Sequence, residues 1–296
     1  MKYIRLSLVF LLSVLVVQAQ DQPTSVFSTE GGARYWVQPD IIYGAANNTQ
    51  LKLDVWYPNE SKTPTPTLVY IHGGGWIFGT KETSVLQFLP FLEKGWRVVN
   101  VEYRMASNSL APAAVEDTRC ALRWVFRNAK LWNFDTTKIV LTGHSAGGHL
   151  SLITGMLPGG TGLDNNCYGD EKLNVAAIIN WYGITDVNDI IQGKNLKNYG
   201  MMWIGSQPNA AEIAKRVSPL TYIRADLPPI LTIHGDKDDV VPYSQATRLH
   251  AELDKAKVKN ELFTIKNGGH GGFTQTDYVN AYNEIWKFLK DNKITQ

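Results

Sequence analysis

The sequence has 296 residues, of which 44% are apolar and 19% are charged. This length is enough for one large domain or two small ones, and the composition excludes a disordered or low-complexity chain. The formal net charge is +2. Lys2 and Arg5 near the N-terminus account for this excess, so the rest of the chain is neutral. The neutral remainder has no basic run and therefore gives no reason to expect a nucleic acid or an anionic lipid as a partner.

The pattern of residues 1–19 is typical of a secretory signal peptide. A basic start is followed by the nearly continuous apolar run 6–17, and Val17-Gln18-Ala19 fits a cleavage site. The apolar run is too short to span a bilayer comfortably, although an N-terminal anchor is the alternative. We therefore predict a secreted or periplasmic protein without a membrane span, whose mature chain, residues 20–296, forms a single domain.

Strand and helix patterns alternate along the mature chain. The expected strands lie within 34–57 and at 68–71, 97–101, 139–142, 175–181, 229–234 and 261–265. The expected helices lie at 83–94, 113–130, from 148 onward, at 244–257 and at 275–290. Residues 182–217 contain no strand pattern, and we interpret them as a cap-like excursion of short helices. The alternation predicts an α/β fold, a mostly parallel central sheet with helices on both faces.

The pentapeptide Gly143-His144-Ser145-Ala146-Gly147 lies between an apolar strand and a helix. Strand, G-x-S-x-G and helix together are the pattern of a nucleophile elbow. Ser145 would occupy a strained turn that lifts its hydroxyl clear of the sheet. Gly143 and Gly147 suit this turn because a Cβ would clash where the strand and the helix nearly touch. The pattern predicts Ser145 as a catalytic nucleophile.

A serine hydroxyl is a weak nucleophile and needs a histidine base that a carboxylate holds in place. His270 is the best candidate for the base, because its glycine-rich loop directly follows the last predicted strand. The acid should lie between serine and histidine in the chain. Three residues compete for this role in the loop after the strand at 229–234, namely Asp236, Asp238 and Asp239.

A glycine-rich segment, His72-Gly73-Gly74-Gly75, follows the predicted strand at 68–71. Acyl transfer builds negative charge on the carbonyl oxygen, and backbone N–H groups can stabilise that charge. Glycines allow the backbone to approach the substrate closely. We expect an oxyanion hole made by the N–H groups of Gly73 or Gly74 together with that of Ala146.

With these residues the chain resembles the α/β-hydrolases over almost all of its mature length. The motifs are H-G-G-G-W at His72, G-H-S-A-G-G at Gly143, H-G-D-K-D-D-V-V-P at His234 and G-G-H at Gly268. Within the superfamily it most resembles the bacterial feruloyl-esterase and acetyl-esterase-like hydrolases, exported enzymes that remove acyl groups from plant polysaccharides. That resemblance implies Asp238 as the triad acid, since the family's acid lies four residues after the H-G histidine. It also implies a small ester or an acylated polysaccharide as substrate.

Aromatic residues near the motifs are candidate substrate contacts. Trp76, Trp181, Tyr182 and Trp203 lie in or near loops expected to rim the pocket, and His144 precedes the nucleophile. Aromatic walls would suit a feruloyl ring, although core packing explains such residues equally well.

The leading hypothesis is an exported serine carboxylesterase without a metal or cofactor. A serine peptidase or amidase of the same fold and a non-catalytic binding protein are the alternatives. The sequence leaves open whether Cys120 and Cys167 form a disulfide or remain free thiols.

Overall fold

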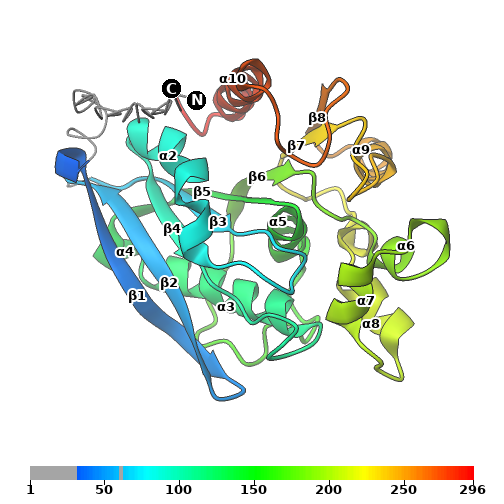
Figure 1. Ribbon diagram of the computed structural model, residues 1–296. Helices are drawn as coiled ribbons and strands as arrows, with labels where there is room; N and C mark the ends of the chain where they lie inside the picture. Colours follow the sequence, from blue (N-terminus) through cyan, green and yellow to red (C-terminus); the bar gives the residue numbers. More distant parts are fainter. Residues whose placement is uncertain (1–31, 60–62) are drawn as a thin grey trace, which may run out of the picture. The chain divides into compact units, whose positions relative to one another are not determined.

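An eight-stranded sheet organises the computed structural model, which describes residues 32–59 and 63–296 (Figure 1). The whole sheet belongs to one compact unit, Arg34–Gln296. Its strand order is β1-β2-β4-β3-β5-β6-β7-β8. The predicted signal peptide lies outside the described residues. The strands are β1 (Tyr35–Ala46), β2 (Thr49–Pro58), β3 (Thr65–Ile71), β4 (Arg97–Val101), β5 (Phe134–His144), β6 (Val175–Trp181), β7 (Ile230–Gly235) and β8 (Asn260–Ile265).

The sheet is antiparallel at one edge and parallel elsewhere. β1 pairs with β2 and β2 with β4 in antiparallel register, whereas every pair from β4 to β8 is parallel. The alternating sequence of β2 buries Leu51, Leu53 and Val55, as expected for a strand near an edge. Every residue of β4 and β7 is buried, because helices cover both faces of the parallel part.

Two hydrophobic clusters fill the two sides of the sheet. One includes buried side chains of α3, α5 and α9, and the other includes those of α2 and α10. Helices on both faces are therefore confirmed. The helical segments are η1 (Lys81–Ser84), α2 (Val85–Glu93), α3 (Ala113–Arg127), α4 (Ala129–Trp132), α5 (Ala146–Met156), α6 (Val187–Ile191), η2 (Gly193–Asn195), α7 (Asn198–Ile204), α8 (Ala210–Arg216), η3 (Pro219–Tyr222), α9 (Ser244–Lys255) and α10 (Gln275–Asp291).

The helices differ from the sequence predictions in two places. The single helix predicted at 83–94 is divided into η1 and α2. The single helix predicted at 113–130 ends at Arg127, and the short α4 follows it. The excursion predicted for 182–217 does consist of short helical segments, α6, η2, α7 and α8. In the described part of the chain, no helix combines the length and the apolar character needed to cross a bilayer.

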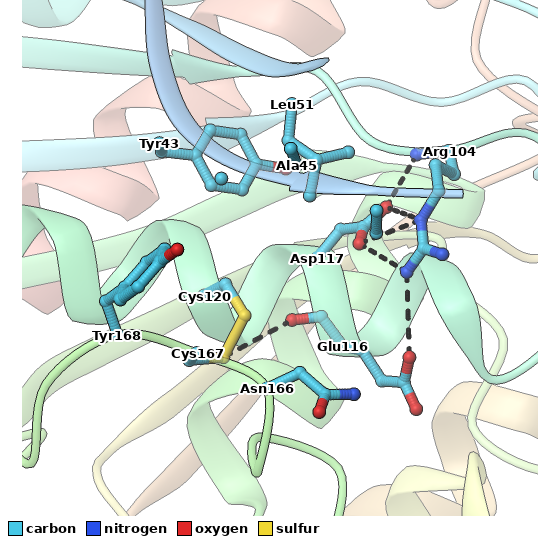
Figure 2. Close-up of a pocket in the computed structure, with 12 residues that line it drawn as sticks. Tyr43, Ala45, Leu51, Arg104, Glu116, Asp117, Cys120, Asn166, Cys167 and Tyr168 are labelled. Atoms are coloured by element: carbon cyan, nitrogen blue, oxygen red, sulfur yellow. Dashed lines mark hydrogen bonds and ion pairs between the residues drawn. A yellow bond between two sulfur atoms is a disulfide. The ribbon is translucent and has the colours of Figure 1, made fainter. Parts of the chain in front are cut away.

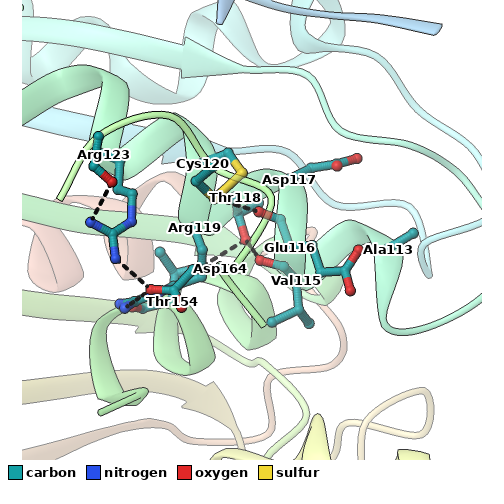
Figure 3. The surroundings of a disulfide bond; sticks show 12 residues. Ala113, Val115, Glu116, Asp117, Thr118, Arg119, Cys120, Arg123, Thr154 and Asp164 are labelled. Atoms are coloured by element: carbon teal, nitrogen blue, oxygen red, sulfur yellow. Dashed lines mark hydrogen bonds and ion pairs between the residues drawn. A yellow bond between two sulfur atoms is a disulfide. The ribbon is translucent and has the colours of Figure 1, made fainter. Parts of the chain in front are cut away.

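The two cysteines form a disulfide, which settles the alternative that the sequence left open. Cys120 on α3 is bonded to Cys167 in the glycine-rich loop after α5 (Figure 3). The same loop is held by Asp164, whose carboxylate lies 2.9 Å from the guanidinium groups of both Arg119 and Arg123. The loop is thus fixed to α3 by one covalent bond and two ion pairs, and we refer to these five residues as the α3 clamp.

Replacing both Cys120 and Cys167 by serine should lower the free energy of unfolding by about 2–4 kcal/mol. The bond joins residues 47 positions apart and so restricts the unfolded chain. Urea unfolding with and without a thiol reductant measures the effect. The reductant should destabilise the original protein and leave the doubly substituted variant unchanged. Identical unfolding midpoints for the original protein under both conditions would contradict the prediction.

Candidate active site

Ser145 lies on a tight turn between β5 and α5. Its backbone has φ 57° and ψ −119°, a conformation that is strained for a residue with a side chain. Its N–H donates to the carbonyl oxygen of Trp181 at 2.9 Å. A Cβ at Gly143 would lie only 2.6 Å from backbone atoms of Gly147, because the end of β5 and the start of α5 nearly touch. The close approach that the G-x-S-x-G spacing predicted is therefore present.

Ser145, His270 and Asp238 form a hydrogen-bonded chain. His270 Nε2 lies 2.8 Å from Ser145 Oγ, and His270 Nδ1 lies 2.7 Å from Asp238 Oδ2. The three residues follow β5, β8 and β7, so they meet at the carboxyl ends of parallel strands. This is the geometry in which a base can take the serine proton while a carboxylate orients the base.

Asp238 is held as a carboxylate by donors on both of its oxygens. The N–H groups of Val240 and Val241 donate to Oδ1 at 2.9 and 2.8 Å. His234 Nε2 lies 3.2 Å from Oδ2 and also donates to the Val241 carbonyl oxygen at 3.0 Å. Burial alone would raise the pKa of Asp238, but the hydrogen bonds from His234 and His270 hold this pKa well below its usual range. An ionised Asp238 accepts the Nδ1 proton of His270 and leaves Nε2 free to accept from serine.

His234 is a residue whose contribution to the site the sequence did not reveal. It lies one residue before the end of β7 and is fully buried. The only available signal was its position four residues before the acid, which does not by itself predict a contact.

The other two aspartates of the acid loop have different partners. Asp236 Oδ1 accepts the backbone N–H of Asn267 at 2.6 Å, which links the acid loop to the loop that carries His270. Asp239 is exposed, and its backbone carbonyl accepts from Lys197 Nζ at 2.6 Å. Of the three aspartates, only Asp238 contacts His270.

The glycine segment after β3 lies beside Ser145. A Cβ on Gly73 would lie 3.7 Å from Ser145 Cβ, and Gly74 has φ 117°, which a residue with a side chain rarely adopts. Within residues 32–59 and 63–296, the backbone N–H groups of Gly73 and Gly74 have no hydrogen-bond partner. Ala146 is the first residue of α5, where N–H groups lack partners within the helix. The expected oxyanion residues are therefore gathered around the serine.

His72 holds the backbone of the glycine segment in place. Its Nδ1 donates to the carbonyl oxygen of Gly73 at 2.8 Å, and its ring stacks on Tyr103 with centroids 4.4 Å apart. The Tyr103 hydroxyl in turn donates to the His72 carbonyl oxygen at 3.0 Å. The glycine backbone is thus pre-organised by buried side chains.

Ser145 and His270 open onto a cavity of about 500 Å³. Tyr182 and Tyr199 from the excursion line it, so this segment does cover part of the pocket as predicted. The other side chains of the wall are Phe78, Thr83, Ser84, Gln87, His144 and Val240. Phe78, Tyr199 and the polar residues of η1 and α2 carried no recognisable sequence signal.

The candidate substrate contacts divide into two groups. His144 and Tyr182 line the cavity, whereas Trp76, Trp181 and Trp203 do not. Trp76 and Trp203 are fully buried and stack on each other with centroids 4.0 Å apart. Trp181 is 2% exposed and stacks beneath His144. The prediction that these three tryptophans contact the substrate is therefore wrong, because proximity to a motif does not determine whether a side chain points to the pocket or to the core.

A second, smaller cavity of about 130 Å³ lies beside the disulfide (Figure 2). Its polar side chains pair with one another, since the Arg104 guanidinium lies 2.7 Å from Asp117 and 3.6 Å from Glu116. None of the candidate site residues lines it. In the described residues, no group of three or more His, Cys, Asp or Glu side chains is arranged to hold a metal ion.

The fold and the geometry of the site define the class of this protein, the α/β-hydrolases. Within that class, the profile of the BD-FAE family matches residues 53–253, and the chain belongs to this family. The predicted α/β-hydrolase fold and the resemblance to feruloyl- and acetyl-esterase-like enzymes are thereby confirmed.

Similar proteins support the assignment. Esterase LipC of Mycobacterium tuberculosis is 27% identical over 80% of this chain and 60% of its own length. The probable carboxylic ester hydrolase LipM of the same organism is 32% identical over 69% of this chain and 48% of its own length. The chain thus spans about half to three fifths of these curated relatives.

Two solved structures match the chain over nearly their full length. A truncated form of a carbohydrate esterase from gut microbiota has 26% identity and a TM-score of 0.74, over 86% of this chain and 96% of that protein. Esterase 2 of Thermogutta terrifontis with bound butyrate has 26% identity and a TM-score of 0.73, over 86% and 94%.

Proposed function

We propose that this protein is a serine carboxylesterase that acts through an acyl-enzyme. The observation that carries the proposal is the hydrogen-bonded chain Ser145–His270–Asp238 at the cavity. Ser145 Oγ attacks the ester carbonyl carbon while His270 Nε2 takes its proton, and Asp238 stabilises the imidazolium. His270 then gives that proton to the departing alcohol oxygen as the carbon–oxygen bond breaks. Water, deprotonated by His270, releases the acid and restores Ser145.

The oxyanion of each tetrahedral intermediate is assigned to the N–H groups of Gly73, Gly74 and Ala146. In the described part of the chain, the N–H groups of Gly73 and Gly74 have no other partner, and this fact together with the buried support from His72 favours the role. Donors fixed before the reaction need no reorganisation when the negative charge develops.

The proposed substrates are short or aromatic acyl esters, in particular acetyl or feruloyl groups on plant polysaccharides. The carbohydrate esterase among the similar structures supports a sugar-linked ester. The polar wall formed by Thr83, Ser84 and Gln87 can offer hydrogen bonds to hydroxyl groups.

A substrate panel tests this function. It compares a nitrophenyl ester, methyl ferulate, acetylated xylan and a peptide nitroanilide, with the Ser145→Ala variant as background. We expect cleavage of esters and little cleavage of the nitroanilide. Cleavage of the peptide substrate alone would replace the esterase assignment by a peptidase or amidase.

The cavity should favour small acyl chains. Tyr182 and Tyr199 line a cavity of about 500 Å³, and the bulk of their rings limits the room for a long extended chain. We expect kcat/KM for nitrophenyl butyrate to exceed that for the palmitate ester by at least about tenfold. Steady-state rates measured below the critical micelle concentration of each ester give this ratio. Faster hydrolysis of the palmitate ester would overturn the expectation.

Export is proposed on the sequence alone. The leader pattern of residues 1–19 predicts that the mature chain begins at Gln20. Mass spectrometry of the protein exported by its host should find this terminus, and an intact Met1 on the exported protein would refute the processing.

A further inference from the structure

Three side chains form a hydrogen-bonded chain along one wall of the cavity. The Tyr70 hydroxyl on β3 donates to Gln87 Oε1 on α2. The same hydroxyl oxygen lies 2.8 Å from Nδ1 of His144, the last residue of β5. Gln87 and His144 both line the cavity, whereas Tyr70 is buried behind them. The proposed mechanism uses none of these three side chains.

The hydrogen-bonding groups of the three side chains determine which atom donates each bond. An amide oxygen only accepts, so the single hydroxyl proton of Tyr70 is committed to Gln87. The Tyr70 oxygen must therefore accept the second bond, which requires a proton on His144 Nδ1. Burial lowers the pKa of the His144 ring to about 3, so the ring is neutral and carries one proton only. His144 Nε2 consequently keeps its lone pair.

This lone pair is open to the cavity. In the described part of the protein, no side chain or backbone group forms a hydrogen bond with His144 Nε2. The atom is nevertheless not fully buried, so a ligand can reach it. The ring lies flat on Trp181, with centroids 4.9 Å apart and an angle of 18° between the planes. The stacking and the Tyr70 bond together fix the direction of the acceptor. Because His144 directly precedes Ser145, this acceptor is close to the reacting ester.

We propose that His144 Nε2 is a fixed hydrogen-bond acceptor that selects esters carrying a hydroxyl group near the ester bond. This inference rests on the proposed esterase function and specifies its substrate. A hydroxyl group can donate a hydrogen bond to this lone pair. An ether oxygen at the same place has no proton to donate, and its own lone pair would be repelled. The hydroxyl can belong to a sugar on the alcohol side or to a phenol on the acyl side.

Matched ester pairs test the proposal and distinguish the two sources. The sugar pair is a methyl 2-O-acetyl-xyloside with a free 3-hydroxyl and its 3-O-methyl ether, and the phenol pair is methyl 2-hydroxycinnamate and its 2-methoxy analogue. We expect kcat/KM to favour the hydroxylated member roughly fivefold in at least one pair, the size of one neutral hydrogen bond. His144→Phe keeps a ring for stacking but has no acceptor, and should bring this ratio close to one.

Tyr43→Phe is the control for this experiment. It removes one buried hydroxyl away from the active site, because Tyr43 donates to the Glu102 carbonyl oxygen and lines the smaller cavity. The hydroxyl preference should survive this change. Hydrolysis of all four esters without any preference would overturn the inference and leave the esterase function intact. Hydrolysis of none of them would instead reject the proposed function.

The proton position can be measured without any activity assay. In protein labelled with ¹⁵N-histidine, His144 should show a protonated Nδ1 and an unprotonated Nε2 at neutral pH. In Tyr70→Phe, which lacks the hydroxyl that accepts from Nδ1, this preference should weaken. A protonated Nε2 in the original protein would overturn the inference even if His144→Phe failed to fold.

Discussion

Replacing Ser145 by alanine should reduce kcat for ester hydrolysis by a factor on the order of 10⁶. The hydroxyl supplies the bond that carries the acyl group, and the methyl group of alanine cannot replace it. The loss should be almost complete because the remaining triad residues act only through this oxygen. Initial rates with a short nitrophenyl ester at high enzyme concentration measure the effect.

The fold should tolerate this change. Ser145 Oγ bonds to His270, but the turn itself is held by the backbone bond from Ser145 to Trp181. Circular dichroism and the urea midpoint of the variant should therefore match those of the original protein. A folded Ser145→Ala protein with substantial activity would exclude Ser145 as the nucleophile.

The second large effect is expected for Asp238→Asn, with a loss of about 10³–10⁴ in kcat. The asparagine oxygen can keep the two bonds from Val240 and Val241, which places its amide NH₂ group toward His270 and His234. That group donates and cannot accept the Nδ1 proton of His270. The imidazole would then favour the tautomer with the proton on Nε2, which cannot accept the serine proton.

The neighbouring aspartates are the matched controls. Asp239→Asn changes an exposed side chain without a triad contact and should lose little activity. Asp236→Asn should have an intermediate effect, because its carboxylate holds the backbone of Asn267 and hence the histidine loop. Near-normal kcat for Asp238→Asn together with a severe loss in either neighbour would reject the assignment of the acid.

The motifs and the sheet could be predicted because each depends on neighbours in the sequence. The spacing of Gly143, Ser145 and Gly147 encodes a close approach of strand to helix, and alternation in the chain encodes the parallel sheet. The choice among three aspartates came from the family resemblance. The structure gives it a physical basis, since the backbone N–H groups that orient Asp238 follow it within the same loop.

Contacts between distant segments could not be predicted in this way. The chain Gln87–Tyr70–His144 joins α2, β3 and β5, and no local pattern relates these residues. Likewise, Trp76 and Trp203 lie near the expected loops, but whether their rings line the pocket or the core depends on the packing of the whole excursion. The pairing of Cys120 with Cys167 could not be predicted either, because it depends on the path of the loop after α5.

The α3 clamp has a consequence for how the protein is produced. Ser145, Asp238 and His270 lie on loops after β5, β7 and β8, and none of them belongs to the clamped loop. Protein made in a reducing compartment would keep its ion pairs but lack the covalent bond. Such a preparation should be fully active when fresh and lose activity sooner on heating or storage. An assay at room temperature would therefore not distinguish the two preparations, whereas a short heat challenge before the assay would.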